Sequence, residues 1–138
     1  MESNRRKRIM SISKDNLPYG FELILDLHGC DTDTFNRSSI ESFFRKLCKK
    51  IDMTQCDLHF WDDVGVVPEE QQTSPHTKGT SAVQFILTST IVIHTLDLKG
   101  AVYINVFSCK EFDFDIVKQF SPEWFKGKIV NNHFIERK

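Results

Sequence analysis

The fold of this chain is decided by residues 79–113, which read GTSAVQFILTSTIVIHTLDLKGAVYINVFSCKEFD. Three runs in this stretch are rich in apolar, β-branched and aromatic residues, a composition typical of strands. They cover residues 81–87, 91–96 and 101–107, and a polar turn at residues 97–100 separates the last two. We therefore expect three strands in close succession, of which the last two form a hairpin.

Strands are predicted on both sides of this stretch as well. Residues 21–27 (FELILDL) alternate between apolar and polar as a strand does, and residues 56–61 (CDLHFW) form another run of this kind. Residues 128–135 are expected to form a final edge strand. The segment at residues 62–78 contains Pro, Gly and many polar residues, so it is predicted to be a long loop.

Two helices are expected. The first lies between the first two strands, because apolar residues recur there at helical spacing and form one stripe. The stripe consists of Ile40, Phe43, Phe44, Leu47, Cys48 and Ile51. Ser38 and Glu41 have the spacing of a capping box at the start of this helix. A shorter helix is predicted over residues 114–120.

This order of elements predicts an α+β fold. We expect a two-layer sandwich in which a mainly antiparallel β-sheet carries the helices on one face. A length of 138 residues suits a single domain, which we assign to residues 17–138. Residues 1–16 are polar, basic and aperiodic, so they are predicted to form a disordered tail.

Composition excludes several classes of partner. The formal net charge is -1, so no overall positive field favours nucleic acid or an anionic membrane. No apolar run approaches the roughly 20 residues that a membrane-spanning helix needs. The four cysteines, Cys30, Cys48, Cys56 and Cys109, form no CxxC pair, and the five histidines show no zinc-binding spacing. We expect a cytoplasmic protein with reduced thiols and no metal.

Four polar residues stand out within the apolar stretch: Ser81, Ser89, His94 and Cys109. A hydroxyl nucleophile, an imidazole and a thiol on adjoining strands are a set of groups suited to covalent chemistry. An imidazole transfers protons near neutral pH, and a thiol does so when its pKa is suitable. Each residue alone has an ordinary structural explanation, since a strand hydroxyl or a buried cysteine is common.

The pattern around these residues resembles a known family. The runs TSTIVIHT and VFSCKEFD are similar to the core of the prokaryotic-type S-adenosylmethionine decarboxylases. The Gly-Cys-Asp turn at residues 29–31 and the stretch IDMT at residues 51–54 agree with this resemblance, which covers most of residues 19–135. It implies a decarboxylase of S-adenosylmethionine in polyamine (spermidine) biosynthesis. It also implies a homodimer or higher homo-oligomer, with active sites near the subunit interface.

The resemblance further implies that the chain makes its own cofactor, a pyruvoyl group. Ser89 matches the serine of self-cleavage, whose hydroxyl attacks the carbonyl of Thr88 and converts the amide to an ester. Elimination and hydrolysis then give fragments 1–88 and 89–138, with the pyruvoyl group at position 89. Its ketone forms a Schiff base with the substrate amine and accepts the electrons released as CO2 departs.

Three more residues receive roles by resemblance. His94 assists self-processing as the base for elimination, and Ser81 assists by hydrogen bonding at the scissile region. Cys109 returns a proton to the substrate carbon after decarboxylation. Residues 89 and 94 point to opposite faces of a straight strand, so Ser89 must lie at a turn or bulge if it cooperates with His94.

Several positions depart from the family pattern. Thr88 and Thr90 stand where the family has Glu and His, and Leu96 stands where it has an aromatic residue that stacks on adenine. Phe60 or Trp61 are candidates to replace the lost ring. Two alternatives therefore stay open: a sister pyruvoyl decarboxylase acting on arginine or ornithine, and an uncleaved, non-catalytic homologue that acts as a binding or regulatory subunit.

Overall fold

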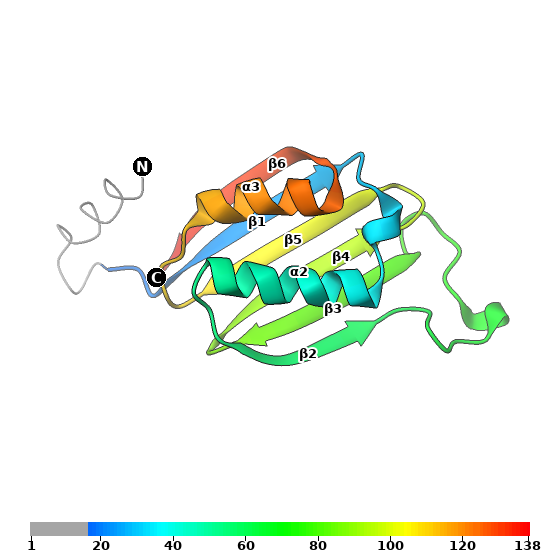
Figure 1. Ribbon diagram of the computed structural model, residues 1–138, viewed down its shortest axis with the longest axis horizontal. Coiled ribbons are helices and arrows are strands. Elements are labelled where there is room, and N and C mark those ends of the chain that lie inside the picture. Colours follow the sequence, from blue (N-terminus) through cyan, green and yellow to red (C-terminus); the bar gives the residue numbers. More distant parts are fainter. Residues whose placement is uncertain (1–16) are drawn as a thin grey trace.

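The computed structural model describes residues 17–138 and confirms the expected α+β sandwich (Figure 1). Six strands form one antiparallel sheet in the order β2-β3-β4-β5-β1-β6. The strands are β1 (Gly20–His28), β2 (Gln55–Trp61), β3 (Gly79–Ile86), β4 (Ser89–Leu96), β5 (Ala101–Ser108) and β6 (Lys128–Arg137). The tail predicted for residues 1–16 lies outside the described residues.

Two α-helices cover one face of the sheet, α2 (Arg37–Lys50) and α3 (Phe114–Phe125) (Figure 1). Two short 3-10 helices, η2 (Thr32–Thr34) and η3 (Pro68–Glu70), lie in the connections. Among residues 17–138, none of the helices combines the length and the apolar character needed to cross a bilayer.

Both helices begin or end differently from the prediction. The side chain of Asn36, rather than that of Ser38, caps α2 by accepting a hydrogen bond of 2.8 Å from the Ser39 N–H, so the capping-box expectation is wrong. Helix α3 continues past residue 120 and through Pro122. Because the Phe125 side chain is completely buried, its packing offsets the helix-breaking tendency of the proline.

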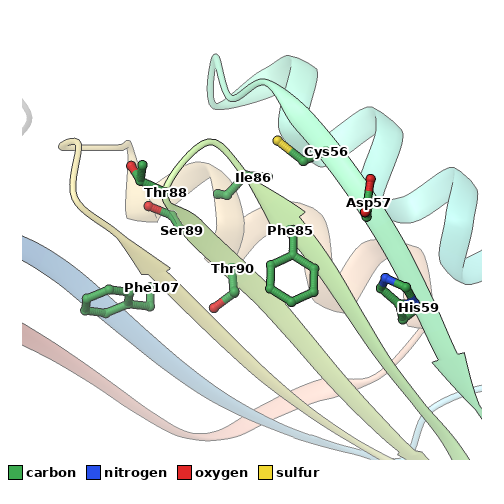
Figure 2. A pocket seen from close by; sticks show the side chains of 9 residues that line it. All are labelled: Cys56, Asp57, His59, Phe85, Ile86, Thr88, Ser89, Thr90 and Phe107. Carbon is green, nitrogen blue, oxygen red and sulfur yellow. The ribbon is translucent and has the colours of Figure 1, made fainter.

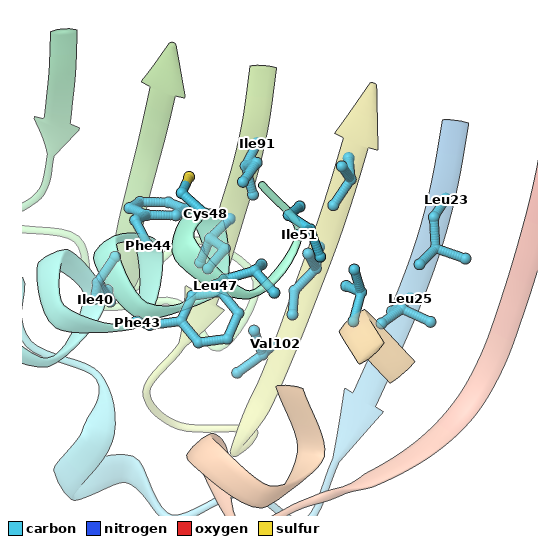
Figure 3. Packing of buried hydrophobic residues seen from close by; sticks show 14 of the residues in the cluster. Leu23, Leu25, Ile40, Phe43, Phe44, Leu47, Cys48, Ile51, Ile91 and Val102 are labelled. Carbon is cyan, nitrogen blue, oxygen red and sulfur yellow. The ribbon is translucent and has the colours of Figure 1, made fainter. Parts of the chain in front are cut away.

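The core fills the space between the helices and one face of the sheet (Figure 3). Strands β1, β4 and β5 each send alternate side chains into it, while the predicted apolar stripe of α2 packs on top. Phe43 lies at the centre, with its ring centroid 5.5 Å from that of Phe120 and 4.9 Å from that of Phe125. Cys48 is buried in this cluster, as its place in the stripe predicts.

The opposite face of the sheet is open. Among the described residues no helix or strand lies over it (Figure 1). It carries the rings of Trp61, 61% exposed, and Phe85, 44% exposed, beside half-buried Val92, Tyr103 and Phe107. An exposed face with this many large apolar side chains is typical of an interaction surface.

Phe43→Ala should lower the free energy of unfolding by about 3–5 kcal/mol, because it removes a fully buried ring and leaves a cavity among four other aromatic side chains. Urea denaturation followed by circular dichroism measures this change. Glu41→Ala, an exposed position on the same helix, is the matched control and should change stability by less than about 0.5 kcal/mol. Equal losses in the two variants would contradict the assigned core.

Candidate active site

The tight turn between β3 and β4 places Thr88 and Ser89 at one end of the sheet. Ile86 pairs with Ser89, so only Leu87 and Thr88 form the connection. Thr88 has a φ of 58°, in the left-handed region that a β-branched residue rarely adopts. Such a conformation stores strain of roughly 1–3 kcal/mol. The residue that contributes the carbonyl group of the Thr88–Ser89 peptide bond is therefore strained.

Ser89 is nearly buried and has a defined partner. Its exposed fraction is 7%, and its Oγ accepts a hydrogen bond of 3.0 Å from the backbone N–H of Cys109. Cys109 directly follows β5, and the antiparallel pairing of β4 with β5 brings it beside the start of β4. The thiol of Cys109 also lies 2.9 Å from the hydroxyl oxygen of Thr88. Thr88, Ser89 and Cys109 thus form one contact group.

A buried serine fixes the turn that holds Cys109. The hydroxyl of Ser108 donates to the carbonyl oxygen of Lys110 at 2.7 Å and accepts from the Lys110 N–H at 3.0 Å. The ammonium group of Lys110 in turn donates to the carbonyl oxygen of Asp52, 2.7 Å away at the end of α2. These bonds tie the Cys109 turn to both layers of the fold.

The environment of Cys109 makes its thiol more acidic than that of an ordinary cysteine. Hydrogen bonds with the hydroxyl of Thr88 and then with that of Ser89 lower the pKa of Cys109. Burial acts in the opposite direction on two other cysteines and raises the pKa of Cys30 and of Cys48 to about 11. Cys109 is therefore better suited to proton transfer than either of these.

Ser81 and His94 form a second contact group. They face each other across β3 and β4, and the Oγ of Ser81 lies 2.8 Å from the Nδ1 of His94. Both side chains lie on the open face, in a cavity of about 410 Å³ that Trp61 and Tyr103 also line. An imidazole held by a hydroxyl in this way has a fixed orientation, and within residues 17–138 its other ring nitrogen makes no hydrogen bond.

Within one chain, the contact group of Ser89 and the contact group of His94 lie far from each other. Ser89 shares the alternation of the buried residues Ile91 and Ile93, whereas His94 points to the open face. Five residues of extended strand separate Ser89 from His94, which corresponds to about 16 Å. The turn at Thr88 places Ser89 at the start of β4, as cooperation with His94 requires, but it does not bring the two side chains together within one chain.

A cavity of about 720 Å³ opens beside Ser89 (Figure 2). Its lining comes from β2, the β3–β4 hairpin and β5: Cys56, Asp57, His59, Phe85, Ile86, Thr88, Ser89, Thr90 and Phe107. Sequence reasoning misses Asp57, His59 and the two rings, because only the register of β2 on β3 puts them near Ser89. The sequence offers one signal: Asp57 and His59 are two residues apart in a predicted strand, so their side chains lie on the same face of the sheet.

Residues 17–138 contain no group of three or more His, Cys, Asp or Glu side chains arranged to bind a metal ion. The groups near Ser89 that can carry out chemistry are a hydroxyl, a thiol and backbone N–H groups, with the Asp57 carboxylate and the His59 imidazole in the same cavity and His94 farther along the open face. This set can support nucleophilic attack and proton transfer.

Comparison with known proteins identifies the family. A family model described as S-adenosylmethionine decarboxylase matches residues 21–138. The chain belongs to the S-adenosylmethionine decarboxylase family. The members of this family are carboxy-lyases.

One solved structure has the same fold as this chain. It is the adenosylmethionine decarboxylase from Aquifex aeolicus VF5, with a TM-score of 0.67 and 19% sequence identity over 87% of this chain and 91% of that one. At this identity the likeness establishes the shared fold. A search of curated protein sequences gave no significant match.

Proposed function

We propose that this family member is a self-cleaving, pyruvoyl-dependent decarboxylase of S-adenosylmethionine that acts in the cytoplasm and serves polyamine synthesis. The observation that carries the proposal is the contact group of Thr88, Ser89 and Cys109. It joins a strained peptide bond, a nucleophile beside that bond and an acidified thiol. The four free cysteines suit a reducing compartment.

Self-cleavage would proceed through the groups of this chain. The Oγ of Ser89 attacks the carbonyl carbon of Thr88, the C–N bond breaks, and an ester joins the two residues. A base then removes the α-proton of residue 89, the Cβ–Oγ bond breaks, and Thr88 leaves as a free carboxylate. Addition of water to residue 89 and loss of ammonia then leave a pyruvoyl group at that position.

The residues around position 89 fit the resulting group. Ser89 lies at the edge of a cavity large enough for a substrate, and the Cys109 N–H and thiol lie beside it. A pyruvoyl group there supplies a ketone that binds the substrate amine covalently and withdraws electrons as CO2 leaves. Cys109 is placed to deliver a proton to the substrate carbon afterwards, and the Thr88 and Ser89 contacts hold it there in the uncut chain.

His94 lies about 16 Å along β4 from Ser89, so the His94 of the same chain is too far away to be the base for elimination. We propose that a second copy of the chain supplies it. In this proposed dimer the two copies stack their open faces about a twofold axis placed so that the Ser89 end of each β4 meets the end that carries His94 and Ser81 in the partner subunit. The exposed rings of Trp61 and Phe85 become buried in the same contact.

The intact mass of the purified protein under denaturing conditions tests the proposal. Two fragments that meet at Thr88 and Ser89, the smaller one starting with a pyruvoyl group, support it. CO2 release from S-adenosylmethionine, arginine and ornithine then identifies the substrate among the three candidates. A single uncut mass after long incubation would instead favour the non-catalytic homologue, for which Thr88 and Thr90 are the sequence signs.

Thr88→Gly should slow self-cleavage by about tenfold, because glycine adopts a positive φ without strain and the driving force stored at the scissile bond disappears. The rate is followed by intact mass during refolding. Thr88→Val is the matched control, since it keeps the strained, branched residue and removes only the hydroxyl. Cleavage of the glycine variant at least as fast as that of the valine variant would exclude a role for strain.

Cys109→Ala should cut normally but lose about a hundredfold in kcat, the range expected for removal of a general acid. The active thiol must be protonated, so activity should fall as pH rises through the pKa of Cys109. The hydrogen bonds from Thr88 and then Ser89 that lower the pKa of Cys109 belong to the uncut chain, since cleavage converts residue 89 and frees the carboxylate of Thr88. This fall of activity at alkaline pH should be absent from Cys109→Ala and should remain in Cys30→Ala. Wild-type kcat in Cys109→Ala would exclude this role.

A further inference from the structure

The wall of the Ser89 cavity that faces the hairpin comes from the edge strand β2 (Figure 2). It carries a carboxylate, Asp57, beside an imidazole, His59. Next to them lie the rings of Phe85 and Phe107, and the imidazole packs edge-on against Phe85 with centroids 6.0 Å apart. Among residues 17–138, no cation lies within ion-pair distance of the Asp57 carboxylate.

A β-bulge lies at the Asp57 end of β2. Gln55 pairs with Ile86, and Leu58 pairs with Gln84. Between these two pairs β2 has two residues where β3 has one, so β2 contains one extra residue. A bulge of this kind bends the strand and changes the direction of its side chains. Asp57 lies within this irregular segment, at the edge of the cavity.

A buried side chain holds the bulge in place. Gln84 is 1% exposed, and its Nε2 lies 3.0 Å from the carbonyl oxygen of Cys56 and 3.3 Å from that of Asp57. Its Oε1 accepts a hydrogen bond of 3.1 Å from the side chain of Gln55. A buried amide with all of these partners is costly to displace, so the bulge is a fixed part of the structure.

We propose that Asp57 is a specificity-determining residue that selects substrates with a positively charged side chain. The proposal rests on the proposed function, in which the substrate amine is bound at residue 89. The sulfonium of S-adenosylmethionine lies only three bonds from its α-carbon, so a substrate anchored at position 89 carries this charge into the same cavity. Asp57 is exposed in the free protein, and a substrate that fills the cavity between it and the rings of Phe85 and Phe107 displaces water, which strengthens the attraction between the carboxylate and a cation.

The test compares two ligands that differ by one methyl group and one charge. S-adenosylmethionine carries a sulfonium, whereas S-adenosylhomocysteine carries a neutral thioether. Binding is measured by isothermal titration calorimetry on full-length Ser89→Ala, which keeps the chain continuous and allows no turnover. We expect about a fivefold preference for the sulfonium, equivalent to one partly exposed charge pair. Adding Asp57→Asn should reduce this preference to nearly none.

Asp33→Asn is the matched control, because it makes the same change on η2, at the opposite end of the sheet from the β3–β4 turn (Figure 1). It should keep the preference. Equal binding of the two ligands by Ser89→Ala overturns the role of Asp57. A preference that survives the addition of Asp57→Asn also overturns it, and the rings of Phe85 and Phe107 then select the cation. Absence of binding by S-adenosylmethionine, arginine and ornithine alike overturns this inference, whereas the intact mass of the unsubstituted chain tests the proposed function separately.

Discussion

Ser89→Ala leaves the protein as one uncut chain without decarboxylase activity. The substitution removes the only oxygen that the proposed acyl shift uses, so neither the ester nor the pyruvoyl group can form. The fold should persist, because the Ser89 hydroxyl bonds with the backbone N–H and the thiol of Cys109, and the loss of each bond costs about 1 kcal/mol. Intact mass should show the full length of 138 residues, and CO2 release should fall to background.

The control for this result is Ser38→Ala, an exposed serine within α2 that should leave cutting and activity unchanged. Two fragments from Ser89→Ala, or a pyruvoyl group anywhere in that variant, would refute the assignment of Ser89. Uncut but fully active protein would refute the cofactor itself while leaving the fold and the family unaffected.

The second large effect is complementation between two inactive variants. Alone, His94→Ala and Ser89→Ala should both remain uncut, the first for lack of a base and the second for lack of a nucleophile. When they are co-expressed, His94→Ala chains should be cut, because Ser89 of such a chain meets His94 of the partner subunit. With equal expression, random pairing places about half of the His94→Ala chains in such mixed dimers.

The masses of the two chains separate the possible mechanisms. Fragments from His94→Ala chains alone support a site shared between two copies. No fragments from the mixture would show that His94 acts within its own chain or that the open faces do not meet. Complete cutting of His94→Ala expressed alone would remove the proposed role of His94. His133→Ala, which changes an exposed histidine on the other edge of the sheet, is the control and should be cut normally.

Much of this fold follows from local patterns. The apolar stripe of α2 and the alternation of β1, β3, β4 and β5 predict both layers, because each element must bury one side. The failures have local causes too. Asn36 and Ser38 are both residue types that cap helices well, and their chemistry alone does not tell which of them the helix uses. The end of α3 depends on the burial of Phe125, which no propensity reveals.

The candidate site was only half predictable. Ser81, Ser89, His94 and Cys109 are visible in the sequence, but the distances between them depend on the register of neighbouring strands. The pairing of Thr90 with Phe107 brings Cys109 to Ser89, and the pairing of Ser81 with His94 joins those two at the other end. Asp57 is hidden more deeply, since only the pairing of β2 with β3 brings it to the cavity beside Ser89.

The separation of Ser89 from His94 along β4 has a consequence for when the protein matures. Under the proposed arrangement, a newly made chain holds a nucleophile at one end of a strand and a base at the other, and it can use neither by itself. Maturation is then a second-order event whose rate rises with the concentration of the chain. Dilute precursor stays inert, and accumulation of the protein beyond its dimerisation constant sets the moment at which activity begins.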